Sequence, residues 1–301
     1  VYMRLRFGGH MFYAHLYNSY TPAWAHARVN KGFSSDAGDV GMQTDLINLE
    51  FELDHWTGAP TTLVGYSYLF DFNNSDPSTA TSGPGGALAG ENSSRASNKV
   101  FGVRLDGEIP FTGTGSKDGV ALLYTGEFAN QSNYSNGNSA IDANYYLGML
   151  GLGVHGVKLS ANYEILGSND RQYAIQTPFA TAFAMNGWAD RIPGNRAPAI
   201  GLVDAWVQAD AASPANWGPA LSGMKMSARY HDFQSDAGNV KYGREFDFRV
   251  TKAISPNITL LAQYAIYWGD SEATQANVGT ATNFNLNQDT QKAWLMGTFK
   301  F

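Results

Sequence analysis

Apolar and polar residues alternate with a period of two in many separate segments of the chain. In the segment 157–165, every second side chain is apolar, beginning with Val157 and ending with Ile165. The polar positions between them are Lys158, Ser160, Asn162 and Glu164. Successive side chains of a β-strand point to opposite faces, so this pattern predicts a strand with one apolar and one polar face. About thirteen such strands are predicted, at 1–7, 11–20, 44–54, 61–72, 99–108, 119–129, 143–154, 157–165, 202–211, 224–231, 245–251, 258–268 and 291–301.

The connections between these segments alternate between short and long. Short turns are expected at Gly8-Gly9, His155-Gly156 and Ser255-Pro256-Asn257. Long polar connections are expected at 21–43, 73–98, 131–142, 168–201 and 270–289. Most of the strands are close to the ~9–11 residues that a tilted strand needs to cross a bilayer. Short turns on one side and long loops on the other are typical of bacterial outer-membrane barrels. The sequence therefore predicts an all-β fold, a transmembrane antiparallel β-barrel that forms a single domain over residues 1–301.

Composition agrees with a barrel rather than with membrane helices. Charged residues make up 15% of the chain and the mean hydropathy is -0.27, whereas a typical soluble domain has about 25% charged residues. We find no run of about 18 apolar residues, so the sequence offers no transmembrane helix. The net charge of -6 argues against a nucleic-acid partner.

The last strand ends in alternating apolar residues that include Phe299 and Phe301. A terminal aromatic residue of this kind resembles the signal that the barrel assembly machinery reads, so that machinery, membrane lipid and lipopolysaccharide are the expected partners. Thirteen is an odd number, whereas single-chain bacterial barrels have even strand counts. Two explanations remain open: strands missing before Val1, which would bring the barrel to about 14–18 strands, or a miscounted strand.

Several segments resemble the alginate-export-like family of Gram-negative outer-membrane porins. The resemblance is carried by 159–170, by the Gln-Thr-Pro segment 175–181, by the Asn-Gly-Trp-Ala-Asp segment within 183–190, by 230–233 and by 242–246. It implies a pore in the outer membrane and further strands upstream of Val1, and it leaves the substrate open. A uronate-type saccharide is one solute class that the resemblance suggests.

The polar faces of the strands would line the lumen of such a pore. The candidates for a role in selectivity are Arg104, Lys158, Lys225, Arg229 and Arg249, with Glu164 and Asp247 as acidic counterparts. Lumenal charges of opposite sign can filter solutes by their field, and arginine binds carboxylates with two hydrogen bonds. The alternative is that these residues pair across strands and only hold the wall together.

The long connection 168–201 contains Phe179, Phe183, Trp188, Asp190 and Arg191. Clustered aromatic residues are unusual in a freely solvated loop. We therefore expect this loop to fold into the barrel as a constriction or plug, and packing against other loops is the alternative.

No enzyme signature is found. The six histidines lack the HExxH spacing, and no GxSxG motif is present. The letters GxGxxG occur at 151–156, but between two strands rather than before a helix, so they predict a hairpin. No catalytic residue, metal site or cofactor is therefore expected. The favoured function is passive diffusion or export of polar or anionic solutes. The alternatives are a plugged barrel that acts as a scaffold or sheath for a periplasmic or redox partner, an outer-membrane enzyme and, more distantly, a soluble β-protein; the oligomeric state is left open.

Overall fold

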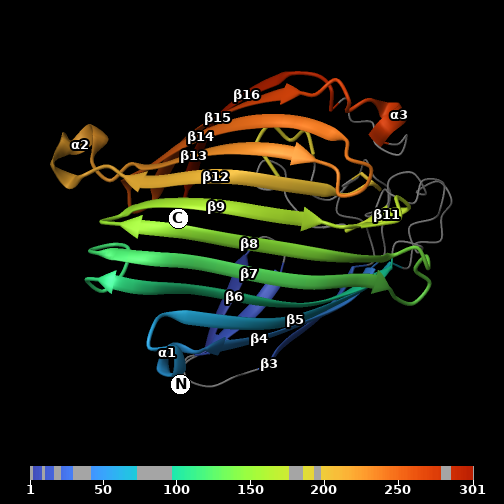
Figure 1. Ribbon diagram of the computed structural model, residues 1–301. Helices are drawn as coiled ribbons and strands as arrows, with labels where there is room; N and C mark the ends of the chain where they lie inside the picture. Colours follow the sequence, from blue (N-terminus) through green and yellow to red (C-terminus); the bar gives the residue numbers. More distant parts are fainter. Residues whose placement is uncertain are drawn as a thin grey trace.

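Twelve long strands form one antiparallel sheet in the computed structural model. The structure describes residues 3–8, 11–16, 22–29, 42–72, 97–175, 186–192, 198–278 and 286–300. The sheet order is β16-β15-β14-β13-β12-β9-β8-β7-β6-β5-β4-β3, so each long strand pairs with the next one along the chain (Figure 1). The strands are β3 (Pro22–Val29), β4 (Met42–Glu52), β5 (Thr61–Phe72), β6 (Asn98–Thr112), β7 (Val120–Asn133), β8 (Asp142–Val154), β9 (Val157–Leu166), β12 (Leu202–Ala212), β13 (Lys225–Gln234), β14 (Lys241–Ser255), β15 (Ile258–Gly269) and β16 (Thr290–Phe299). The all-β antiparallel prediction is confirmed.

The described residues contain one strand more than the roughly thirteen predicted, when the two-residue strands β10 and β11 are left aside. A separate hairpin consists of β1 (Met3–Gly8) and β2 (Met11–Leu16), which with the twelve strands of the sheet makes fourteen strands of six residues or more in the described part of the chain. The additional strand is β3, which lies inside the stretch 21–43 that was expected to be a loop.

The sheet is strongly curved, so that β3 and β4 lie behind the strands at the front of the view (Figure 1). Within the described residues, β3 and β16 form its two edges. Curvature of this kind is what a barrel wall requires. Closure of the wall into a barrel remains a prediction.

The connections differ in length between the two ends of the sheet. At one end lie 113–119, the two residues 155–156 and the two residues 256–257; at the other lie 134–141, 167–201 and 270–289. There are two exceptions to the predicted alternation. The connection 213–224 at the short-turn end carries η3 (Ala215–Trp217) and α2 (Gly218–Leu221), and 235–240 at the long-connection end is short. In Figure 1, α2 and α1 (Asp54–Thr57) mark the short-turn end, and α3 (Gln275–Val278) and β11 (Tyr173–Ala174) mark the long-connection end.

The turn between β8 and β9 has the geometry of a type I′ hairpin. Val154 pairs with Val157, and the two residues between them, His155 and Gly156, have φ angles of 47° and 86°. Both positions of a type I′ turn need positive φ, which asparagine followed by glycine adopts most readily.

Substitutions in this turn are therefore expected to change stability in opposite directions. Gly156→Ala should lower the free energy of unfolding by about 1–2 kcal/mol, because an alanine is strained in the left-handed region. His155→Asn should raise it by a few tenths of a kcal/mol, roughly the benefit of a better turn residue. Urea unfolding of the folded protein measures both changes. Equal stability of the two variants would show that the turn does not have this geometry.

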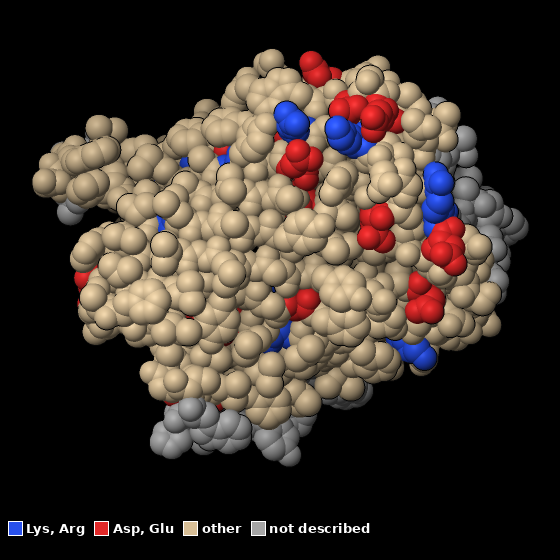
Figure 2. Space-filling view, viewed as in Figure 1, with Lys and Arg blue, Asp and Glu red and all other residues tan. Residues whose placement is uncertain are grey.

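The two faces of the sheet have the opposite polarity to those of a soluble β-protein. Large apolar side chains on one face are exposed, among them Leu150 (64%), Leu159 (56%), Val207 (58%) and Leu295 (82%). The other face buries polar side chains, including Glu50, Asp204, His231, Glu245, Asp247 and Gln263. Figure 2 shows the exposed face as a broad surface with few charges, and charged side chains gather toward the long-connection end. No helix among the described residues is long and apolar enough to cross a membrane.

The apolar core lies between the polar face of the sheet and the connections of the long-connection end. Its large buried members include Tyr173, Trp188, Leu202, Phe233, Tyr242 and Tyr267. Tyr173 belongs to the short β10–β11 pair, β10 being Ser168–Asn169, and its hydroxyl donates to the side-chain oxygen of Gln131 at 2.7 Å. Burial raises the pKa of the Tyr173 hydroxyl above its ordinary range. Part of the connection 167–201 is thus packed against the sheet rather than against solvent.

Candidate functional site

The polar face of β9, β12, β13 and β14 carries most of its charges in two layers, and the exceptions are Asp210, opposite Lys158, and Arg229, opposite Asp247. Acidic residues lie toward the long-connection end: Glu164, Asp204, Glu245 and Asp247, called here the acidic layer. Basic residues lie toward the short-turn end: Lys158, Lys225 and Arg249, called here the basic layer. The layers arise because residues two apart on a strand share a face, and the antiparallel register places Glu164 beside Asp204.

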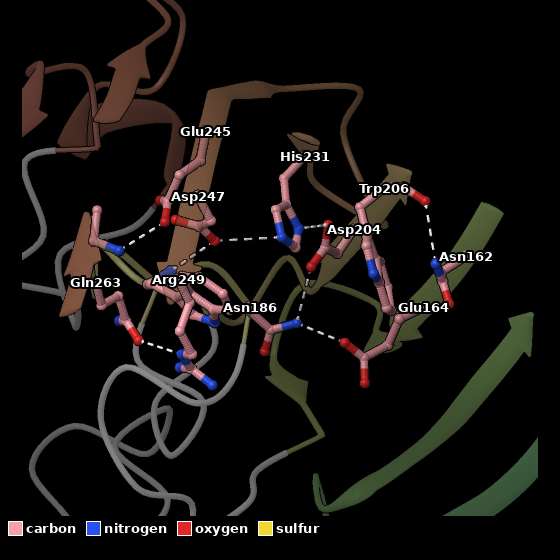
Figure 3. A network of polar contacts seen from close by, with 12 residues as sticks. Asn162, Glu164, Asn186, Asp204, Trp206, His231, Glu245, Asp247, Arg249 and Gln263 are labelled. Carbon is pink, nitrogen blue, oxygen red and sulfur yellow. Dashed lines mark hydrogen bonds and ion pairs between the residues drawn. The ribbon is translucent and has the colours of Figure 1, made fainter. Parts of the chain in front are cut away.

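His231 joins two members of the acidic layer. Its Nδ1 lies 2.8 Å from Asp204 Oδ1, and its Nε2 lies 3.6 Å from Asp247 Oδ2 (Figure 3). All three side chains are almost completely buried. Within the part of the chain that the structure describes, no three His, Asp or Glu side chains are arranged to hold a metal ion.

The segment 186–192 lies directly on the acidic layer and supplies hydrogen-bond donors to it. The amide Nδ2 of Asn186 donates to Glu164 Oε2 at 2.6 Å and lies 3.5 Å from Asp204 Oδ2. The backbone N–H groups of Trp188 and Ala189 donate to Asp247 Oδ2 at 3.2 Å and to Glu245 Oε1 at 2.6 Å. Hydrogen bonds to a carboxylate are among the stronger ones in proteins, and here they bind the segment to the wall.

Gly187 is required where the segment approaches the wall. Its φ is 85°, a conformation that favours glycine. A Cβ at this position would lie 2.7 Å from the Oε2 atom of Glu245. A larger residue would therefore displace either the Glu245 carboxylate or the segment, and both changes disturb the contact between them.

Trp188 connects the two layers. Its side chain is only 1% exposed, and the guanidinium carbons of Arg249 and Arg229 lie 4.0 Å and 4.9 Å from a ring centroid of the indole. Arg249 also donates from Nε to Gln263 Oε1 at 2.7 Å. An indole face attracts cations, so Trp188 stabilises two like charges close to each other.

The remainder of the segment is attached to β15 and β16. Asp190 forms an ion pair with Lys292 at 3.3 Å, and the guanidinium of Arg191 lies 5.8 Å from the centroid of the Tyr267 ring. Ile192 is 2% exposed within the apolar core. The segment is thus held at several points along its described length.

The basic layer lines a cavity of about 350 Å³ near the short-turn end. Lys158, Lys225 and Arg249 contribute to its lining together with Asp210. Neither lysine forms an ion pair with another residue of the described part of the chain, and both side chains are exposed. The cavity therefore presents more positive than negative charge.

Arg104 belongs to a different group of charges. It contacts Asp106 Oδ2 at 2.6 Å and Glu127 Oε2 at 2.7 Å, and the hydroxyl of Tyr66 also donates to Glu127 at 2.6 Å. The contact with Glu127 is a cross-strand pair of the kind that the alternative interpretation of the sequence describes, whereas Asp106 lies on the same strand as Arg104.

The structure brings most of the predicted lumenal residues together on one wall. Lys158, Glu164, Lys225, Arg229, Asp247 and Arg249 share the polar face of neighbouring strands, and Trp188, Asp190 and Arg191 lie against it. Phe299 lies on the outward face of β16 and is 63% exposed. Phe179, Phe183 and Phe301 lie outside the described residues.

The site residues expected from the sequence did not include Asn186, Gly187, His231 or Gln263, although Asn186 and Gly187 lie in the Asn-Gly-Trp-Ala-Asp segment that carries the family resemblance. The alternation of apolar and polar residues in β13 and β15 places His231 and Gln263 on the polar face, so the sequence contained a pattern that indicates these two residues. For Asn186 and Gly187 no local pattern indicates contact with the wall, because their partners are distant in the sequence.

Comparisons with known proteins find likeness among solved structures. No family model matches the sequence, and no curated protein matches it. Among solved structures, the chain is similar to the OmpF protein of Salmonella typhi in complex with daunomycin, with 11% identity and a TM-score of 0.37 over 93% of this chain and 96% of that chain. The resemblance to the alginate-export-like family remains a prediction, and the function must be argued from the residues themselves.

Proposed function

We propose that this chain forms a channel of the Gram-negative outer membrane through which polar or anionic solutes diffuse passively. The observation that supports this proposal is the polarity of the sheet, with large apolar side chains exposed on one face and charged side chains buried on the other. Water would oppose such an arrangement, whereas lipid outside and a polar lumen inside would stabilise it. Strands of 10–15 residues, as from β6 to β9, are long enough to cross the hydrocarbon.

The basic layer supports a preference for anions. Its lysines and Arg249 face a cavity on the proposed lumenal side, where fixed charges raise the local concentration of ions of opposite sign. Saccharides with carboxylates, such as uronates, combine the negative charge and hydroxyl groups that this wall could bind. We propose them as the solute class, with membrane lipid, lipopolysaccharide and the barrel assembly machinery as partners of the outward face and the last strand.

A plugged barrel is the second candidate, and one feature favours it. The segment 186–192 and the apolar core fill space on the polar side of the sheet at the long-connection end. If this packing closes the lumen, the protein would act as a scaffold or sheath instead of a channel.

Single-channel recording in a planar bilayer tests the proposal. We expect discrete conductance steps and, in a salt gradient, a reversal potential that indicates preference for chloride over potassium. Heat-dependent gel mobility serves as the control that the inserted protein is folded. Folded protein that produces no steps would contradict the channel and favour the plugged barrel.

A further inference from the structure

We propose that the segment 186–192 sets the ion selectivity of the channel by covering the acidic layer, so that the charges accessible to permeating ions on this wall are those of the basic layer and Asp210. This inference rests on the proposed channel function. It assigns a specificity-determining role to Asn186, Gly187 and Trp188, which contribute no charge of their own. The argument depends on which charges of the wall the segment covers and which it leaves accessible.

The acidic layer would otherwise dominate the field on this wall. Glu245 and Asp247 are 0% exposed and Asp204 is 1% exposed, although all three lie on the polar face of the sheet. His231, Arg229 and Arg249 are the basic groups that face these carboxylates from the sheet, and Lys292 faces Asp190 of the segment. Uncovered carboxylates in a lumen attract cations, as rings of acidic side chains do in cation channels.

Each carboxylate of the layer has contact with the segment. Asn186 contacts Glu164 and Asp204, and the backbone of Trp188 and Ala189 contacts Asp247 and Glu245. Asp247 Oδ1 and Glu245 Oε2 have no hydrogen-bond partner in the described structure, so water would solvate both atoms if the segment moved away. The segment is thus both the hydrogen-bond partner of the layer and its barrier to water.

The same segment leaves the positive charges accessible. Arg249 stacks on Trp188 and also lines the cavity that Lys158 and Lys225 share. The acidic side chain of that cavity lining is Asp210. With the segment in place, the accessible charge on this wall is therefore positive.

The test is Gly187→Ala, with Gly148→Ala as the matched control, in the recording described above. An alanine Cβ at 187 would collide with Glu245, whereas a Cβ at 148 on β8 meets nothing within 4 Å. We expect the reversal potential of Gly187→Ala to change sign, from chloride preference to potassium preference, and that of Gly148→Ala to stay as in the unchanged protein. Asn186→Ala, which removes the contacts with Glu164 and Asp204, should shift the potential in the same direction by a smaller amount.

The outcomes separate this inference from the proposed function. A conducting protein whose selectivity is unchanged in both Gly187→Ala and Asn186→Ala would overturn the role of the segment and leave the channel intact. An unchanged protein that never conducts would overturn the channel itself. If Gly187→Ala fails to fold, Asn186→Ala decides, because it removes one side-chain amide and introduces no collision.

Discussion

Replacing Leu150 with arginine is expected to destabilise the folded protein in lipid by about 2–4 kcal/mol, the cost of an arginine near the middle of a bilayer. Leu150 is 64% exposed on the outward face of β8, with the exposed side chains of Tyr146 and Val154 on either side along the strand. In a soluble protein, the same exposed position would tolerate arginine within about 0.5 kcal/mol. Equilibrium unfolding in urea, followed in vesicles, measures the difference.

Asn144→Arg is the matched control on the same strand and the same face. Asn144 lies near the long-connection end of β8, where its side chain accepts a hydrogen bond from Asn130 at 3.1 Å. It is about 20 Å along the strand from Leu150, at roughly 3.3 Å per residue. Arginine near the interface should cost only about 0–1 kcal/mol. Equal small costs at both positions would indicate that the face contacts water.

Replacing both cavity lysines, in Lys158→Gln/Lys225→Gln, is expected to reduce the preference for chloride over potassium several-fold. A unit charge about 5 Å from a permeating ion contributes about 0.8 kcal/mol in water, or a factor of about four in its local concentration. The effect should decrease as salt is raised, because salt screens exposed charges. Reversal potentials at low and high salt measure both quantities.

Lys117→Gln/Lys241→Gln is the control for this change in net charge. Lys117 lies in the connection 113–119 and Lys241 at the start of β14, and neither lines the cavity. This variant removes the same charge and should leave the permeability ratio close to its original value. If both pairs of substitutions change selectivity equally, the basic layer has no special role.

The period-two alternation of apolar and polar residues predicted most of the strands of the fold. It placed Glu164, Asp247 and Arg249 on the same face as the structure does. Successive side chains of a strand point to opposite faces, so the apolar face of a strand determines which residues lie on the polar face. The alternation failed at β3, whose apolar positions include Ala23, Ala25 and Ala27. Alanine is small and favours helices, so the strand signal there was weak.

The arrangement of the segment 186–192 could not be predicted from the sequence. The hydrogen bond from Trp188 to Asp247 joins residues 59 positions apart, and no periodic pattern encodes such a contact. The aromatic content of the connection indicated packing, but not which groups would be covered. Only the structure shows that a glycine, an asparagine and two backbone N–H groups meet the carboxylates of the wall.

The central claim, that the apolar face of the sheet contacts lipid, is tested most directly by a spin label. The chain has no cysteine, so Leu150→Cys and Asn144→Cys each give one labelling site. In vesicles, we predict that a nitroxide at position 150 is relaxed strongly by oxygen and hardly by a water-soluble nickel chelate, and that one at position 144 is reached by the chelate. Free access of the chelate to position 150 in folded protein would contradict the account.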